Sequence, residues 1–149
     1  MACPKPTSGK VCAPCEGGEA SGLKLYTAED LHEELASLPL WTASADGNFI
    51  IRSFVAKNFV SAIAFLNGVA AVAEEQGHHP DLHLTQYRNV EIRLQTHSMG
   101  GVTKNDIEEA RLFDQIPVDY SPKWLREHPE ASATAAASPT EAPATSSAC

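Results

Sequence analysis

The stretch from Asn58 to Gln76 most strongly limits what this chain can fold into. Its apolar residues recur at helical spacing, at Phe59, Ile63, Leu66, Val69, Ala70 and Ala73. Gly77 follows directly, and glycine commonly ends a helix because it adopts the left-handed backbone conformation without strain. The pattern therefore predicts one long helix that stops at Gly77.

Two hairpins are expected, one on each side of this helix. The segment LWTASADGNFIIRSFVA contains two strand-like stretches about the turn residues Asp46-Gly47-Asn48. After HHPDLHLTQYRN, the segment VEIRLQTH places Val90, Ile92 and Leu94 in alternation with polar residues. That period of two is typical of a strand with one buried face.

Two shorter helices complete the expected core. In TAEDLHEELASL, Thr27 and Asp30 have the spacing of a capping box. Thr103 and Asp106 open another helix in the same way, and this helix should end before Pro117. The order helix, hairpin, helix, hairpin, helix predicts an α+β domain in which helices cover one face of antiparallel strands.

The two ends of the chain differ in composition from this core. Residues 1–22 are rich in Gly, Pro, Ser and Cys, and we expect an irregular lead-in. Residues 126–149 are rich in Ala, Ser, Thr and Pro without large apolar residues, so we expect disorder there and a domain over residues 23–125. Cys12 and Cys15 form a CxxC pair, which we interpret as thiols of the lead-in because no second pair completes a zinc site.

The net charge and the distribution of apolar residues limit the partners and the compartment of the chain. The net charge of −8 argues against binding to nucleic acid or to anionic membranes. No run approaches the roughly 18 apolar residues of a membrane span, and the first residues lack the apolar region of a secretory signal. We expect a cytoplasmic protein, with a mitochondrial or plastid form as the alternative.

The histidines at the end of the long helix are the main candidates for chemistry. Pro80 pushes His79 away from helical geometry, so His78 and His79 should lie on a turn with diverging side chains. His97 falls at the end of the last strand, on its polar face. Imidazole titrates near neutral pH, at about 6.5, and suits proton transfer. Structural histidines on the surface remain the alternative.

The same histidines and the carboxylates near them admit other roles. A metal site built from His78, His79, His83 and His97 is less favoured, because adjacent histidines rarely chelate one ion and no HxH or HxxxH pattern occurs. Asp106 either caps its helix or orients a nearby imidazole, and the two roles can coexist. Glu74 lies one turn before His78 on the same helical face, and is otherwise a solvated acid.

The spacing of these residues resembles that of the pterin-4a-carbinolamine dehydratases, and more specifically their plant and algal branch. The resemblance runs from about Thr27 to Ile116 and rests on Glu74, His78, His79, Pro80, Tyr87, His97 and Asp106. It implies a four-stranded antiparallel sheet with three helices, a homodimer or homotetramer, and no metal or other cofactor.

The resemblance also implies an activity. Family members remove water from 4a-hydroxytetrahydropterin to give quinonoid dihydropterin, which recycles the cofactor of aromatic amino acid hydroxylases. His78 and His97 would be the acid and base, while His79, with Pro80, would position the pterin, supported by Asp106 and Glu74. Some members instead act as dimerisation cofactors of transcription factors, so a non-catalytic binding module is the alternative.

Overall fold

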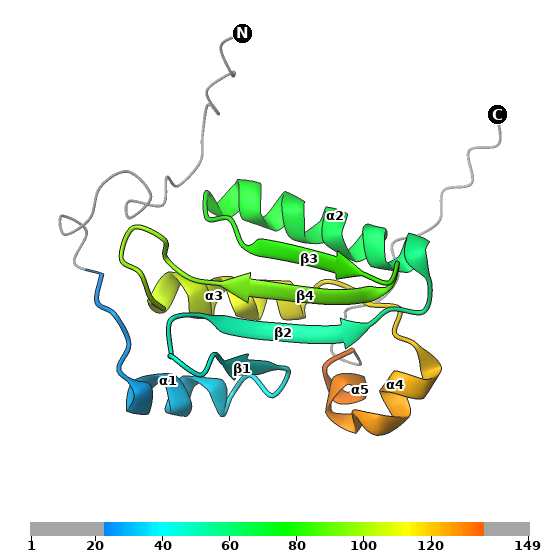
Figure 1. Ribbon diagram of the computed structural model, residues 1–149, viewed down its shortest axis with the longest axis horizontal. Coiled ribbons are helices and arrows are strands. Elements are labelled where there is room, and N and C mark those ends of the chain that lie inside the picture. Colours follow the sequence, from blue (N-terminus) through cyan, green and yellow to red (C-terminus); the bar gives the residue numbers. More distant parts are fainter. Residues whose placement is uncertain (1–22, 136–149) are drawn as a thin grey trace, which may run out of the picture.

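The computed structural model describes residues 23–135, and residues 1–22 and 136–149, which hold all the cysteines, lie outside the described part (Figure 1). The elements follow the predicted order and add two short helices at the C-terminal end. They are α1 (Ala28–Leu35), β1 (Trp41–Ala43), β2 (Ile50–Val55), α2 (Phe59–Gln76), β3 (Asp81–Thr85), β4 (Asn89–Leu94), α3 (Lys104–Asp114), α4 (Pro122–Glu127) and α5 (Pro129–Ala135).

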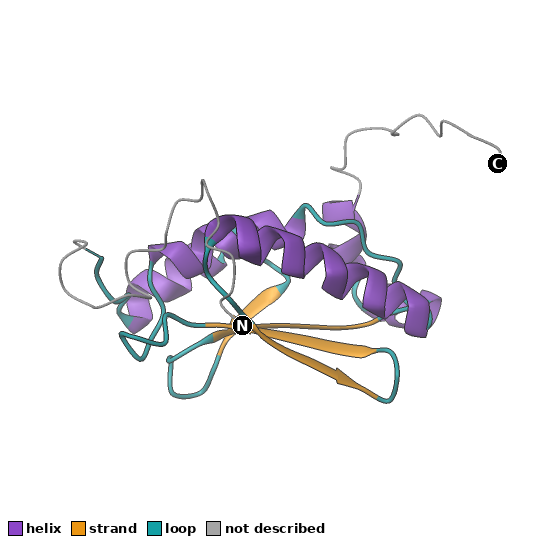
Figure 2. Ribbon diagram, turned by 90° about the horizontal axis from the view of Figure 1, so that it is seen from above, coloured by secondary structure: helices purple, strands orange, loops and turns teal. Residues whose placement is uncertain are grey.

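The strands form one antiparallel sheet in the order β1-β2-β4-β3. Because β2 and β3 each pair antiparallel with β4, they run parallel to one another, and α2 connects them across β4. Figure 2 shows the helices gathered on one face of this sheet. The predicted α+β class, the four-stranded sheet and its helix-covered face are confirmed.

Local sequence signals set the helix ends as expected. Thr27 and Asp30 exchange the two hydrogen bonds of a capping box at the start of α1. The side chain of Asn58 accepts a hydrogen bond from the backbone N–H of Ser61 and so caps α2. Gly77 ends α2 with φ at 67°, a left-handed conformation that explains the glycine there.

The core lies between the sheet and the helices. Alternate residues of the two central strands point into it, which confirms the burial expected for Val90, Ile92 and Leu94. Side chains from the two longest helices close the other side, contributed by Ala62, Phe65, Val69, Ala73, Ile107, Ala110 and Phe113.

A charged residue, Arg52, occupies one of the inward positions of β2 and is 2% exposed. Its guanidinium donates hydrogen bonds to Asp114 Oδ1 at 2.9 Å, to the carbonyl oxygen of Phe113 at 3.2 Å and to the hydroxyl of Tyr120 at 2.8 Å. These contacts compensate the burial of the charge and join the middle of the sheet to the end of α3.

The C-terminal helices correct the expected domain end. Disorder from residue 126 onward is wrong for residues 126–135, which comprise the end of α4, its C-cap His128 and α5. Trp124 stacks between Tyr120 and His128, with ring centroids 5.0 and 4.1 Å away. Ala131 is fully buried in the core. The Ala-rich composition concealed this packing because small residues can bury completely without supplying a large apolar signal.

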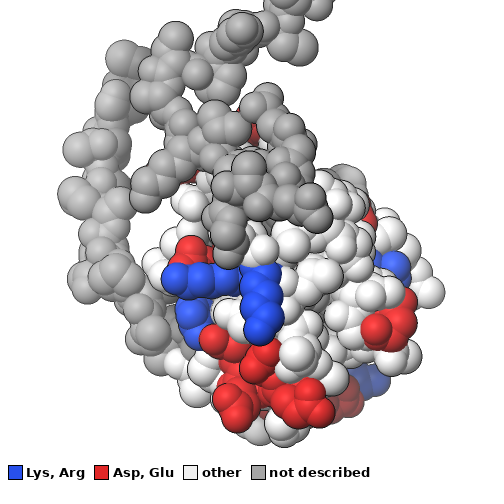
Figure 3. Space-filling model, turned by 90° about the vertical axis from the view of Figure 1, so that its left-hand side faces the viewer, with Lys and Arg blue, Asp and Glu red and all other residues white. Residues whose placement is uncertain are grey.

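The surface agrees with the acidic composition. Glu29, Asp30 and Glu33 are exposed on α1, and Figure 3 shows acidic side chains gathered in the lower part of the face on which α1 lies. Among residues 23–135, no helix is long and apolar enough to cross a membrane.

Candidate active site

The candidate site forms where the second hairpin meets the first turn of α3. The start of β3 lies beside the end of β4, since Asp81 pairs with Arg93 in the antiparallel register. The histidines that precede β3 therefore lie close to the residues that follow β4. A bridge between Thr96 and Gly101 then turns the chain back toward α3.

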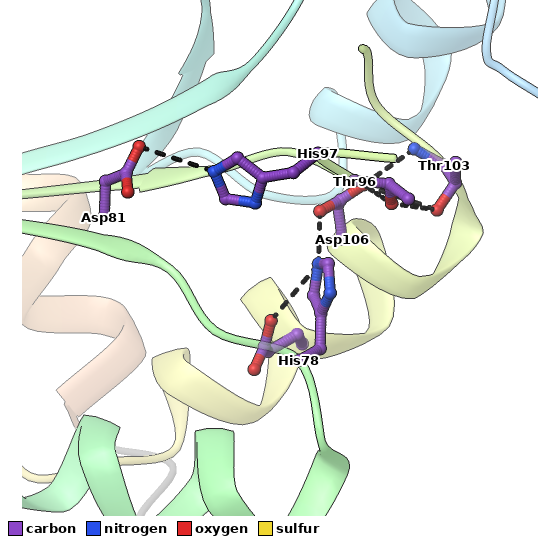
Figure 4. A network of polar contacts seen from close by, with 7 residues as sticks. His78, Asp81, Thr96, His97, Thr103 and Asp106 are labelled. Carbon is purple, nitrogen blue, oxygen red and sulfur yellow. Dashed lines mark hydrogen bonds and ion pairs between the residues drawn. The ribbon is translucent and has the colours of Figure 1, made fainter. Parts of the chain in front are cut away.

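His78 is the buried member of the histidine pair and is 3% exposed. It follows the left-handed Gly77, which turns the chain away from α2 toward α3. The His78 Nε2 atom lies 2.6 Å from Oδ1 of Asp106, a short hydrogen bond drawn in Figure 4. The predicted divergence of the two histidines is confirmed, because His79 points to solvent.

Asp106 both caps α3 and orients His78. Its Oδ2 atom accepts hydrogen bonds from the backbone N–H of Thr103 at 2.8 Å and from the hydroxyl of Thr96 at 2.9 Å. The two threonine hydroxyls are 2.8 Å apart and continue this network. Asp106 is fully buried, so all of these contacts are shielded from water and hold the carboxylate in one orientation.

Glu109 is a second buried carboxylate at the site, and the sequence reasoning missed it. It lies one turn after Asp106 on α3, is 2% exposed, and has Oε2 at 3.7 Å from His78 Nε2. Among the residues that the structure describes, neither of its oxygens has a hydrogen-bond partner. Burial raises the pKa of Glu109 to about 7, against the opposing effect of His78 and with a further rise from Asp106.

The exposed histidines have carboxylate partners of their own. His79 is 61% exposed, and its Nε2 atom lies 2.8 Å from Oε1 of Glu74. Glu74, which lies one turn before His78 in the sequence, pairs with His79 and is 78% exposed, in agreement with the solvated acid named as its alternative. His97 is 57% exposed, with Nε2 3.8 Å from Oδ2 of Asp81, and Figure 4 shows its ring directed toward Asp81.

One signal could have revealed Glu109 in advance. Positions three residues apart share a helical face, so Glu109 had to lie near any imidazole that Asp106 orients. Thr96, directly before His97, offered no comparable signal, because its partners Thr103 and Asp106 come from α3 and its N-cap. Within residues 23–135, no group of three or more His, Cys, Asp or Glu side chains is arranged to hold a metal ion.

The raised pKa of Glu109 predicts a pH-dependent stability. The folded protein keeps a proton on Glu109 that the unfolded chain releases between pH 4.5 and about 7. The stabilisation from this proton is complete below pH 4.5 and is lost as the pH rises through about 7. Glu109→Gln cannot ionise, so its stability relative to the wild type should rise by up to about 3 kcal/mol across this window.

Urea unfolding followed by circular dichroism at several pH values across that window measures this difference. Glu108→Gln is the matched control, because Glu108 is 55% exposed on the same helix and pairs with Lys104. Its stability relative to the wild type should stay nearly constant with pH. A Glu109→Gln profile parallel to that of the wild type would contradict the buried, protonated carboxyl.

The comparison with known protein families identifies the family of the chain. The model of the family described as Pterin 4 alpha carbinolamine dehydratase matches residues 24–116. The chain belongs to this family. The match includes every candidate site residue and ends before α4 and α5. The resemblance stated from the motif is therefore confirmed at the level of the family.

Curated relatives carry the family name as well. A putative pterin-4-alpha-carbinolamine dehydratase of Rhodopseudomonas palustris is 42% identical over 101 residues, which cover 68% of this chain and 99% of the relative. Pterin-4-alpha-carbinolamine dehydratase 2, mitochondrial, of Arabidopsis thaliana is 35% identical over 114 residues. That alignment covers 75% of this chain and 59% of the Arabidopsis protein.

A solved structure supports the fold. The crystal structure of a transcriptional coactivator/pterin dehydratase from Brucella melitensis superposes with a TM-score of 0.59 at 35% identity. The superposition covers 62% of this chain and 98% of the Brucella chain. The family core is therefore shared, and the remaining part of this chain lies beyond it.

Proposed function

We propose that the chain is a hydro-lyase that dehydrates 4a-hydroxytetrahydropterin to quinonoid dihydropterin and water. Family membership and the names of the relatives support this reaction. The observation that carries the proposal is the collection of His78, His79 and His97 at one end of the sheet, where each imidazole faces a carboxylate.

The chemistry requires one proton to be delivered and another to be removed. Delivery to the 4a-oxygen forms an O–H bond as the C4a–O bond breaks, and loss of the N5 proton completes the double bond. Neither step requires a nucleophile or a redox group. Histidines suit both transfers because their charge changes near neutral pH.

Exposure divides the roles among the residues of the site. His97 and His79 present their rings to solvent and can meet the pterin directly. His78 is nearly buried, and its hydrogen bond to Asp106 fixes the orientation of the ring. This setting suits an acid–base group, because neighbouring carboxylates can control its protonation. We assign His78 and His97 as the acid–base pair, His79, Pro80 and Glu74 to substrate positioning, and Asp106 to holding His78.

A stopped-flow dehydration assay with synthetic carbinolamine tests the activity. The protein should accelerate the reaction in proportion to its concentration, above the rate of the uncatalysed dehydration. His32→Ala serves as a control, because His32 is exposed on α1, outside the site, and its loss should leave the rate unchanged. A rate equal to the uncatalysed one would refute the proposal.

A non-catalytic binding role is the second candidate. The Brucella protein is described as a transcriptional coactivator/pterin dehydratase. If this chain had only that role, it would bind a protein partner and fail the dehydration assay. We propose the enzyme as the main role, acting as a homodimer or homotetramer on the product of an aromatic amino acid hydroxylase.

A further inference from the structure

Glu109 is a buried residue of the candidate site to which the dehydration chemistry assigns no role. It is not among the positions on which the family resemblance rests. Its carboxylate is buried, and neither oxygen has a hydrogen-bond partner among residues 23–135. An ionised carboxylate in that setting is costly unless it is protonated or faces a cation.

The available neighbours restrict where a proton can reside. The charged groups that face Glu109 are His78, after the end of α2, and Asp106, one turn earlier on α3. Asp106 uses Oδ2 to accept hydrogen bonds from Thr103 and Thr96, and Oδ1 faces His78. Both oxygens of Asp106 are thus engaged by hydrogen bonds, whereas neither oxygen of Glu109 is within the described part of the chain, so His78 and Glu109 are the two groups between which a proton can move.

We propose that Glu109 is a positioning residue that shares one proton with His78 and thereby sets the charge of that imidazole. When Glu109 is ionised, its negative charge at 3.7 Å favours the imidazolium form of His78. When Glu109 is protonated, His78 is neutral and both groups avoid an unpaired buried charge. The two arrangements carry the same net charge, so the proton moves between them without a new charge entering the core.

This inference deepens the proposed function and rests on it for its catalytic meaning. A general acid or base works best when its two protonation states are both accessible at the working pH. Asp106 alone, bonded to Nε2 at 2.6 Å, would favour the imidazolium. Glu109 adds a second group whose own ionisation near neutral pH couples to the same nitrogen, so the pair titrates jointly.

The test measures the charge of His78 directly. Protein labelled with ¹⁵N-histidine is titrated by NMR from about pH 5 to about pH 9, where neutral and charged imidazole differ, and His78→Gln assigns the signal. We expect Glu109→Gln to move the His78 transition to lower pH by about one unit or more, because an opposite charge within about 4–6 Å is lost. Glu108→Gln should titrate like the wild type.

Glu109→Met provides the second variant in case the glutamine variant does not fold, because it removes the carboxylate at similar volume. The pH–rate profile of dehydration should shift in the same direction as the NMR transition. A His78 transition that stays at the wild-type pH in a folded variant would overturn the inference.

The spectra are obtained without substrate, so the two proposals fail separately. An inactive wild type with a shifted His78 transition in the variant refutes only the dehydratase function. An active wild type with no shift in the variant refutes only the role of Glu109.

Discussion

The double variant His78→Gln, His97→Ala is expected to lose nearly all acceleration of carbinolamine dehydration while it remains folded. General acid–base groups typically contribute about 10²–10⁴-fold each. The substrate also dehydrates without enzyme, so the visible loss should lie near the lower end for each single variant. In the double variant no imidazole remains at either assigned proton-transfer position.

The choice of glutamine at position 78 follows from the buried cluster. His78→Ala would remove the hydrogen-bond partner of Asp106 Oδ1 and leave this buried carboxylate poorly compensated, which would destabilise the fold. The glutamine amide can still donate a hydrogen bond to Asp106. Loss of activity in this variant therefore reports on proton transfer more than on folding, which circular dichroism checks.

Two comparisons complete the kinetic experiment. His79→Ala should raise KM more than it lowers kcat, because the exposed ring is assigned to positioning. His32→Ala should behave as the wild type. A folded double variant with near-normal turnover would show that neither His78 nor His97 transfers the proton.

The largest loss of stability is expected from Arg52→Met. The variant keeps much of the side-chain volume but removes the guanidinium that pairs with Asp114 at 2.9 Å. Asp114 would retain its hydrogen bond from Trp41 Nε1 and remain a poorly compensated, nearly buried charge. Breaking such a pair typically costs about 3–5 kcal/mol.

Arg93→Met is the matched control, since Arg93 lies on the neighbouring strand β4 and its ion pair with Glu91 is only partly buried. The side chains of Arg93 and Glu91 are 40% and 34% exposed, and such surface pairs contribute about 0–1 kcal/mol. Urea unfolding of both variants gives the two costs. Equal costs for the two variants would mean that the buried network around Arg52 does not stabilise the fold.

The pH dependence of the Arg52→Met variant provides a further check. Burial already raises the pKa of Asp114, with Arg52 acting in the opposite direction. Removing Arg52 should raise that pKa further, so the carboxyl takes up a proton more readily as the pH falls. The destabilisation should therefore be smaller in mildly acidic solution than at neutral pH.

The sequence by itself determined the order and most of the ends of the family-core elements, because those features depend on neighbouring residues. Thr27 and Asp30 form their capping box, Gly77 ends α2, and Val90, Ile92 and Leu94 face the core. Each outcome follows from local hydrogen bonds or from the period of one strand. The histidine motif likewise identified the family, which the match over residues 24–116 confirms.

Only the tertiary structure decided which of these side chains is buried and which partner it has. His78 meets Asp106 from 28 positions away, while the neighbouring His79 turns to Glu74 and solvent. Arg52 is buried because Asp114, 62 residues later, compensates its charge, and Ala131 is buried because α5 packs on the core. The burial and the partners of a charged side chain depend on elements that are distant in the sequence and adjacent in the fold. A local sequence pattern therefore does not reveal them.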